Sequence, residues 1–320
     1  YSNLFVPGAM KAGTTSLAAA LDQHPQIALH PFKEPMYFAQ TPASREKLYE
    51  LLSPDGESYD RVTPHNSISY VDLETYLSGF AGAQDARYRL DASTMYLQSP
   101  DAIALARAAS PDARFIAVLR DPYARAYSAY QYQRSRMREP AATFAEAIAH
   151  ERSGARDTWM YGWRYVFSSL YFEQVARLFA EVPEAERLVV FFEDLVGAGG
   201  LDPVFRFLGL PSHDIGMVFE NETVLLEGTA ARAAARLTHN QRLGRVVRGV
   251  LPASAVASVR SAVAVARKFV YRSGTRPAPM TSADRALMSD LVEPDLDRLE
   301  RLLDRDLSAW RFHARNRVTS

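Results

Sequence analysis

The chain begins with a short apolar segment, a glycine loop and a helix-forming segment, and this order strongly constrains the fold. Residues 4–6 predict a buried strand, and a helix is expected over residues 14–23, where Pro25 ends it. Between the two lie Gly8 and Gly13, five residues apart. A strand, a glycine loop and a helix in this order begin a βαβ unit. A loop that opens a helix directs backbone N–H groups and the positive helix end toward an anion.

Strand and helix patterns alternate along the rest of the chain. Further strands are expected at residues 27–29, 88–92, 114–120 and 188–192, and helices at 101–109, 121–137, 168–181 and 203–208. Residues 40–85 read as surface helices and loops, and 284–306 as an acidic helical stretch. Elements of these lengths in alternation predict an α/β fold, with a central parallel sheet flanked by helices and a helical C-terminal part.

The glycine loop departs from the P-loop pattern G-x-x-x-x-G-K-[ST] at one informative position. Thr14 stands where the pattern has Lys, and the lysine lies earlier, at Lys11. The chain has 33 Arg but only 4 Lys, so abundance does not explain Lys11. Thr14, Thr15 and Ser16 add hydroxyl donors. This arrangement favours an anion with one phosphate and one further group over a nucleoside triphosphate with Mg²⁺. The structural alternative is a glycine turn with Thr as a helix cap.

A second anion site is expected where the strand at residues 114–120 ends. Arg120 lies at the carboxyl edge of the sheet, where open α/β sheets bind ligands. Ser128 follows eight residues later on a helix that Asp121 is expected to cap. A guanidinium and a hydroxyl that converge on one oxyanion form a phosphate clamp. The alternative is a structural ion pair between Arg120 and Asp121.

Together these segments resemble the sulfotransferases that use 3′-phosphoadenosine 5′-phosphosulfate (PAPS), in particular their bacterial and heparan-sulfate-type branch. The matching segments, in order, are residues 11–17, 33–38 (Lys-Glu-Pro-Met-Tyr-Phe), 90–97, Arg120 with Ser128, 191–195 and 207–211. The resemblance implies a fold like that of P-loop NTPases and a single sulfotransferase domain over 1–320. In that domain an α/β core with the PAPS site covers 1–225, and a helical region at 226–320 completes the cofactor site.

The resemblance also implies roles for individual residues. PAPS would contact Lys11, Ala12, Gly13, Thr14, Thr15, Ser16, Arg120, Ser128 and Arg276. In-line transfer without a metal would leave 3′,5′-ADP, with Lys11 stabilising the leaving group and Glu34 as the general base. The seven His show no metal-ligand spacing. An ion pair with Lys33 or a capping role is the structural alternative for Glu34.

The acceptor is expected to be a small molecule, a glycan or a lipid. Aromatic and Arg side chains are frequent in residues 131–167, the region that covers the acceptor site in the resembling enzymes. Candidate acceptor contacts are Met36, His65, Tyr96 and Trp159, although any single aromatic residue could simply be core. Many relatives have His at the Met36 position, and heparan-type relatives have Lys in the segment of Ala92. The missing Lys disfavours a highly anionic acceptor.

Charge and composition exclude several other classes. With 37 basic and 37 acidic residues the formal net charge is zero, which disfavours a dedicated nucleic-acid binder. The absence of Cys excludes disulfides, thiolate metal sites and a Cys nucleophile. Residues 229–276 carry nine Arg, one Lys and no acidic residue. This stretch is either a peripheral membrane contact or a solvated helical surface that faces the acidic tail.

A soluble, cytoplasmic enzyme is expected, and the sequence assigns no oligomeric state. Two other functions stay open at this point. A P-loop kinase or nucleotide hydrolase would need the Lys beside Thr14, and a non-catalytic nucleotide-binding module would not need Glu34.

Overall fold

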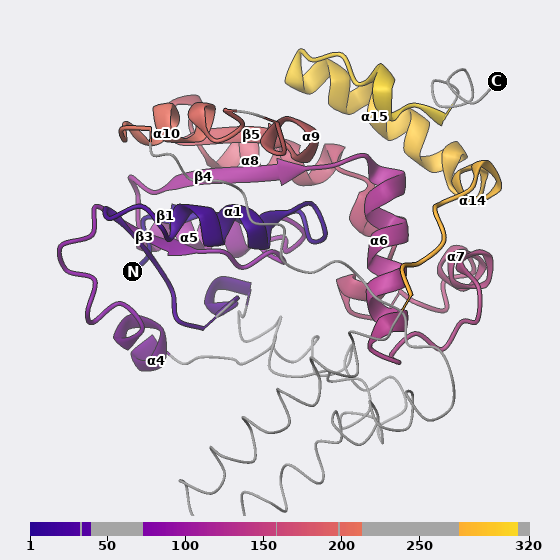
Figure 1. The fold of residues 1–320 in the computed structure, drawn as a ribbon, viewed down its shortest axis with the longest axis horizontal. Coiled ribbons are helices and arrows are strands. Elements are labelled where there is room, and N and C mark those ends of the chain that lie inside the picture. The colour runs from indigo at the N-terminus through magenta and orange to yellow at the C-terminus, as the bar shows by residue number, and fades with distance from the viewer. Residues whose placement is uncertain (33, 40–72, 158, 198, 213–274, 313–320) are drawn as a thin grey trace, which may run out of the picture.

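Five parallel strands form the central sheet of the computed structural model, in the order β2-β3-β1-β4-β5 (Figure 1). The structure describes residues 1–32, 34–39, 73–157, 159–197, 199–212 and 275–312. The strands are β1 Leu4–Phe5, β2 Ile27–Leu29, β3 Tyr88–Asp91, β4 Arg114–Leu119 and β5 Arg187–Phe191. The expected α/β fold with a parallel sheet is therefore confirmed.

Helices pack around this sheet, and those expected at residues 14–23, 101–109, 121–137 and 203–208 lie close to their expected bounds. The helices are α1 Thr14–Leu21, α4 Leu73–Ser78, α5 Ala102–Ala109, α6 Pro122–Ser135, α7 Phe144–Arg152, α8 Phe172–Glu181, α9 Phe192–Leu195, α10 Asp202–Leu208, α14 Ser282–Ala286 and α15 Ser289–Leu303. Short 3₁₀ turns lie at η1 Tyr37–Ala39, η2 Tyr161–Trp163, η3 Phe167–Ser169, η4 Glu184–Glu186 and η5 Ser308–Trp310. None of the described helices has the length and apolar character needed to cross a membrane.

The sheet is the centre of the hydrophobic core. Residues 115–119 of β4 are fully buried, as is β1. Across this pair the rings of Phe5 and Phe115 stack with centroids 4.9 Å apart. Complete burial of a side chain of this kind stabilises the fold by roughly 1.5–3 kcal/mol. A continuous apolar run such as β4 is typical of a strand covered on both faces.

The start of α6 follows from local sequence, whereas the start of α8 does not. The Asp121 carboxylate accepts the N–H groups of Tyr123 and Ala124, as expected for an N-cap followed by Pro. The helix expected from residue 168 instead begins at Phe172, after the separate turn η3. The reason is tertiary, since the Asp295 carboxylate on α15 accepts the N–H groups of residues 171 and 172 and caps α8 from outside.

The C-terminal part described here is helical, as expected, but consists of two helices. α14 and α15 replace the single acidic stretch expected at 284–306, with a break at residues 287–288. Most of the expected helical region, residues 226–274, lies outside the described residues, and so do residues 40–72. The proposed membrane contact through 229–276 therefore stays a prediction.

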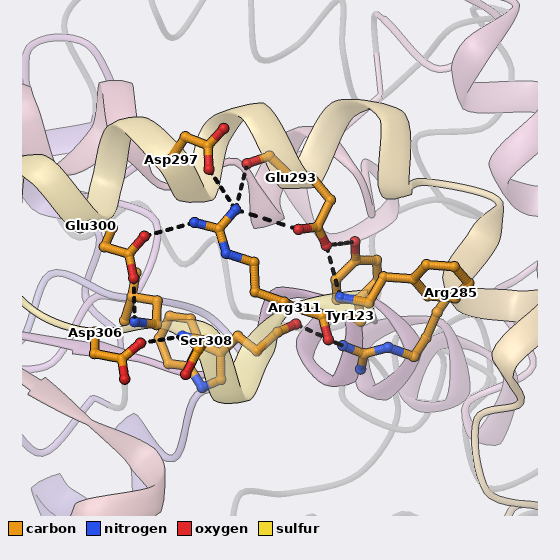
Figure 2. A network of polar contacts seen from close by, with 11 residues as sticks. Tyr123, Arg285, Glu293, Asp297, Glu300, Asp306, Ser308 and Arg311 are labelled. Atoms are coloured by element: carbon orange, nitrogen blue, oxygen red, sulfur yellow. Dashed lines mark hydrogen bonds and ion pairs between the residues drawn. The ribbon is translucent and has the colours of Figure 1, made fainter. Parts of the chain in front are cut away.

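A polar network attaches α14, α15 and η5 to the start of α6 (Figure 2). Arg285 Nη1 lies 3.0 Å from Asp121 Oδ2, and both side chains are buried. The Tyr123 hydroxyl donates to Glu293 Oε1 at 2.7 Å. Arg311 pairs with three carboxylates of α15, those of Glu293, Asp297 and Glu300. Because Asp121 directly follows β4, these contacts join the C-terminal helices to the carboxyl edge of the sheet.

The contact between α15 and α8 predicts a pH-dependent stability. Burial raises the pKa of Asp295 to about 6, despite the two N–H donors that favour its charged form. The folded protein then binds more protons than the unfolded chain between about pH 4 and 6, so this carboxyl lowers stability as the pH rises through that range. The Asp295→Asn variant should lack this loss, which amounts to at most about 3 kcal/mol.

Denaturant unfolding at pH 4, 5, 6 and 7 measures this difference. The free energy of unfolding of the unmodified protein should fall relative to Asp295→Asn across the range. Asp85→Asn, at an exposed position, is the control and should follow the unmodified protein. Parallel pH curves for the unmodified protein and Asp295→Asn would contradict the prediction.

Candidate active site

The two segments expected to bind anions meet where the strand order reverses. The chain leaves β1 for β2 and β3 on one side of the sheet and then crosses to β4 on the other side. The loop after β1 continues the pairing with β4, because Ala9 N donates to Val118 O at 2.7 Å and Val118 N donates to Gly8 O at 2.8 Å. Ligands of open α/β sheets bind at such a reversal, outside the carboxyl ends of the strands.

The loop over residues 8–13 has the geometry of an anion cradle. Lys11 and Gly13 both adopt left-handed backbone conformations, with φ of 68° and 90°. Such local reversals turn successive N–H groups toward one point. Gly13 caps α1 without a side-chain hydrogen bond, and the first turn of α1 contains no acidic residue. That turn carries the buried Thr14 and Ser16 and the half-buried Thr15, and Ala12 before it is buried.

Arg120 is joined to this loop directly. Its Nη1 donates to the Lys11 carbonyl at 3.3 Å, and its guanidinium lies over the Phe192 ring, 4.8 Å from the centroid. A Cβ at Gly13 would lie only 2.5 Å from Phe192 Cδ2. Phe192, the first residue of α9, therefore packs against both predicted anion sites. In the sequence Phe192 belongs to the supporting motif at residues 191–195. The position of Phe192 directly after β5 is the signal that could have identified it.

The Lys11 ammonium lies over an aromatic ring of α6. Its Nζ is 4.3 Å from the centroid of Tyr132, and the Arg136 guanidinium is 4.7 Å from the same centroid. A contact of this kind contributes about 0.5–1 kcal/mol at an exposed site and more when desolvated. Tyr132, one of the aromatic residues expected near the acceptor, thus helps to hold Lys11.

The segment of Arg276 runs beside the part of α6 that carries Ser128. The Tyr127 hydroxyl donates to Ala278 O at 3.0 Å, so the chain before α14 runs beside the helix turn that carries Ser128 (Figure 1). Ser128 is half-buried and Arg276 is exposed. The phosphate contacts of both residues stay predictions.

Glu34 lies at the carboxyl end of β3. Its backbone is left-handed, with φ of 58°, and its carboxylate accepts a hydrogen bond from Thr94 Oγ1 at 3.2 Å. The side chain is only half-buried, and a carboxylate in such a place can accept a proton. Its role as a base stays a prediction. Thr94 was not identified as a site residue from the sequence.

The expected acceptor contacts differ in their surroundings. Met36 is 2% exposed and belongs to an apolar cluster with Met95, Met160 and Trp163, against which Trp159 packs. This methionine cluster is distinct from the main core, and its member Met36 lies two residues after Glu34.

Tyr96 and His65 complete the set of expected acceptor contacts. Tyr96 is fully buried, and its hydroxyl donates to Asp91 and accepts from the backbone of Phe38. Its partners are therefore protein groups, and a contact with the acceptor stays a prediction. His65 lies outside the described residues.

A buried arginine, Arg125, contacts the backbone of the anion loop and was not identified from the sequence. Arg125 is fully buried, and it donates to Met10 O at 3.4 Å, to Tyr165 O at 2.7 Å and to Ser169 Oγ at 2.7 Å. Burial lowers the pKa of its guanidinium. Its place between Arg120 and Ser128 is the only sequence signal that could have revealed it.

Comparisons with known proteins identify the family of this chain. Residues 3–214 match the sulfotransferase family. The region is 27% identical over 216 residues to the mouse bifunctional heparan sulfate N-deacetylase/N-sulfotransferase 3, and 26% identical to its human counterpart. These alignments cover 65% of this chain but only 22% of the curated relatives. A sulfotransferase structure from Alicyclobacillus acidocaldarius is 25% identical, with a TM-score of 0.63 over 97% of this chain and 98% of that one.

The chain therefore belongs to the sulfotransferase family. Its fold is the P-loop-like α/β scaffold expected from the sequence.

The close packing of Gly13 against Phe192 makes a testable prediction about the loop. The Gly13→Ala variant places a Cβ against the Phe192 ring in a left-handed conformation, which costs about 1–2 kcal/mol before any clash. Denaturant unfolding should show this loss. Gly82→Ala is the control, because a Cβ there meets nothing within 4 Å, and it should change stability by about 0.5 kcal/mol at most. Equal stabilities of the two variants would contradict the prediction.

Proposed function

We propose that the protein transfers the sulfuryl group of PAPS to a hydroxyl or amine acceptor and releases 3′,5′-ADP. The observation that carries this proposal is the contact between the two cationic segments, Arg120 Nη1 to the Lys11 carbonyl at 3.3 Å. PAPS bears a 5′-phosphosulfate and a 3′-phosphate on one ribose, so it needs two anion sites on one edge of the sheet. Two such segments converge here.

The residues fit this donor. The left-handed loop at Lys11 and Gly13 and the uncapped start of α1 suit the 5′-phosphosulfate. We assign the 3′-phosphate to Arg120, Ser128 and Arg276. The hydrogen bond between Tyr127 and Ala278 supports this grouping, since it brings the segment of Arg276 next to α6.

Two side chains carry the chemistry in this proposal. PAPS supplies a sulfuryl group on a phosphate leaving group. Lys11 donates a hydrogen bond to the oxygen that leaves and so stabilises the charge that develops there. Glu34 accepts the proton of the acceptor, whose oxygen or nitrogen forms the new bond to sulfur.

We further propose that residues 1–320 form one sulfotransferase domain, in which the C-terminal helices complete the site. The buried pair of Arg285 with Asp121 supports this, because it attaches α14 to the residue next to Arg120. Removal of one partner of a buried pair leaves an uncompensated charge and is strongly destabilising.

The acceptor we propose is a small molecule, glycan or lipid that presents an apolar face beside its hydroxyl or amine. The methionine cluster supports this, because thioether side chains adapt to varied apolar shapes. Ala92, which is 7% exposed, lies in the segment in which the resembling heparan-type enzymes have Lys, and the missing Lys disfavours a highly anionic glycan.

Nucleotide titration distinguishes the proposal from a P-loop kinase or hydrolase. Isothermal titration should show tight binding of 3′,5′-ADP without metal and weak binding of ATP with Mg²⁺. Tight binding of ATP–Mg²⁺ alone would overturn the assignment of the donor.

The Glu34→Gln variant tests the base. The amide keeps the shape of the side chain but cannot accept the proton, so turnover should fall by about 10²–10⁴-fold while the affinity for 3′,5′-ADP stays the same. Sulfuryl transfer from PAPS to a panel of phenols, alcohols and glycans, followed by mass spectrometry, provides the measurement. Glu74→Gln, on the exposed side of α4, is the matched control. Near-normal turnover of Glu34→Gln would exclude Glu34 as the base.

A further inference from the structure

We propose that Asp91 is the positioning residue of the catalytic base, because it holds the backbone after Glu34 through two hydroxyl relays. This inference rests on the proposed function, in which Glu34 accepts the acceptor proton. It assigns a role to a buried carboxylate that contacts neither of the predicted anion sites.

Asp91 ends β3 in a fully buried place where four donors converge on its carboxylate. Oδ1 accepts from the N–H of Ser93 at 3.0 Å and from its hydroxyl at 2.6 Å. Oδ2 accepts from the hydroxyls of Tyr96 at 2.9 Å and Tyr76 at 3.0 Å. Burial raises the pKa of Asp91, and the hydrogen bonds from Ser93, Tyr96 and Tyr76 oppose that shift.

Two of these hydroxyls also accept hydrogen bonds from the backbone of the segment that follows Glu34. Ser93 Oγ accepts from the N–H of Met36 at 2.9 Å, and the Tyr96 hydroxyl accepts from the N–H of Phe38 at 3.2 Å. A hydroxyl has one hydrogen. Since each gives its hydrogen to Asp91, its lone pairs are left for the backbone N–H groups. The carboxylate thus sets the direction of both relays.

The segment needs such support because its backbone is strained. Glu34 and Met36 are both left-handed, with φ of 58° and 57°. For residues other than Gly this conformation costs roughly 1–2 kcal/mol each. The turn after β3 also contacts the carboxylate of Glu34, since Thr94 Oγ1 donates to Glu34 Oε2. The end of β3 therefore holds both the backbone that follows Glu34 and the side chain of Glu34 itself.

The structure offers a matched pair of variants. Tyr96 and Tyr76 are both fully buried, and both donate to Asp91 Oδ2. Only Tyr96 relays to the 36–38 segment, whereas the Tyr76 hydroxyl bonds to Ser2. Tyr→Phe at either position keeps the ring and removes one hydrogen bond to the same oxygen. The stability losses should be similar, about 1 kcal/mol each.

The two variants should differ in catalysis. Tyr96→Phe should lower kcat about tenfold with an unchanged Kd for 3′,5′-ADP, whereas Tyr76→Phe should stay within about twofold of the unmodified protein. In the Glu34→Gln background the Tyr96→Phe effect should disappear, because the relay acts through the base. Equal kcat values for Tyr96→Phe and Tyr76→Phe would overturn the proposal, as would a full Tyr96→Phe effect in the Glu34→Gln background.

Hydrogen exchange tests the tether without any activity assay. The Phe38 amide should exchange faster in Tyr96→Phe and stay protected in Tyr76→Phe; equal protection in both variants would overturn the tether. If the tether is confirmed but Glu34→Gln retains normal turnover, the role of Glu34 fails rather than the contact. Asp91→Asn should have a larger effect, because its amide NH₂ would point at hydroxyl groups that donate to the carboxylate of Asp91. If this variant does not fold, the comparison of Tyr96→Phe with Tyr76→Phe still tests the proposal.

Discussion

Parallel hydrogen bonding on both sides of β1 is the constraint on which the site depends. Leu4 and Phe5 pair with β3 on one side and β4 on the other. The residues that follow these three strands must therefore meet at one edge of the sheet. Here they are the glycine loop, the turn after Asp91, and Arg120. In that turn Leu97 N donates to Pro7 O, and Arg120 Nη1 donates to the Lys11 carbonyl in the loop.

Polar residues at this edge have two kinds of partner. Lys11 and Arg120 lie against the aromatic faces of Tyr132 and Phe192, and contacts of this kind orient a cation. The buried carboxylate of Asp91 instead accepts four hydrogen bonds from protein groups. Full satisfaction is necessary there because an unpaired polar group away from water is costly.

Local signals were sufficient for much of the fold and for the anion loop. The strand at Ile27–Leu29, the Asp121 cap and the helix stop at Gly209 all depend on residues within a few positions of one another. The roles of Asp91 and Phe192 could not be predicted in this way. Phe192 contacts Gly13 and Arg120, and the hydroxyls that bind Asp91 accept from the backbone of Met36 and Phe38. These residues lie far along the chain, and no local pattern marks them.

By itself, the sequence determined the alternation of strands and helices, the family and the segments that carry charge at the sheet edge. These features follow from propensity, capping and motif spacing, which act over a few residues. Only the tertiary structure decided the strand order, the start of α8 under Asp295 and the relays from Asp91 to the segment after Glu34. The relays join residues about 60 positions apart because the strand order places β2 beside β3, and the Asp295 cap joins residues about 120 positions apart because α15 packs against α8.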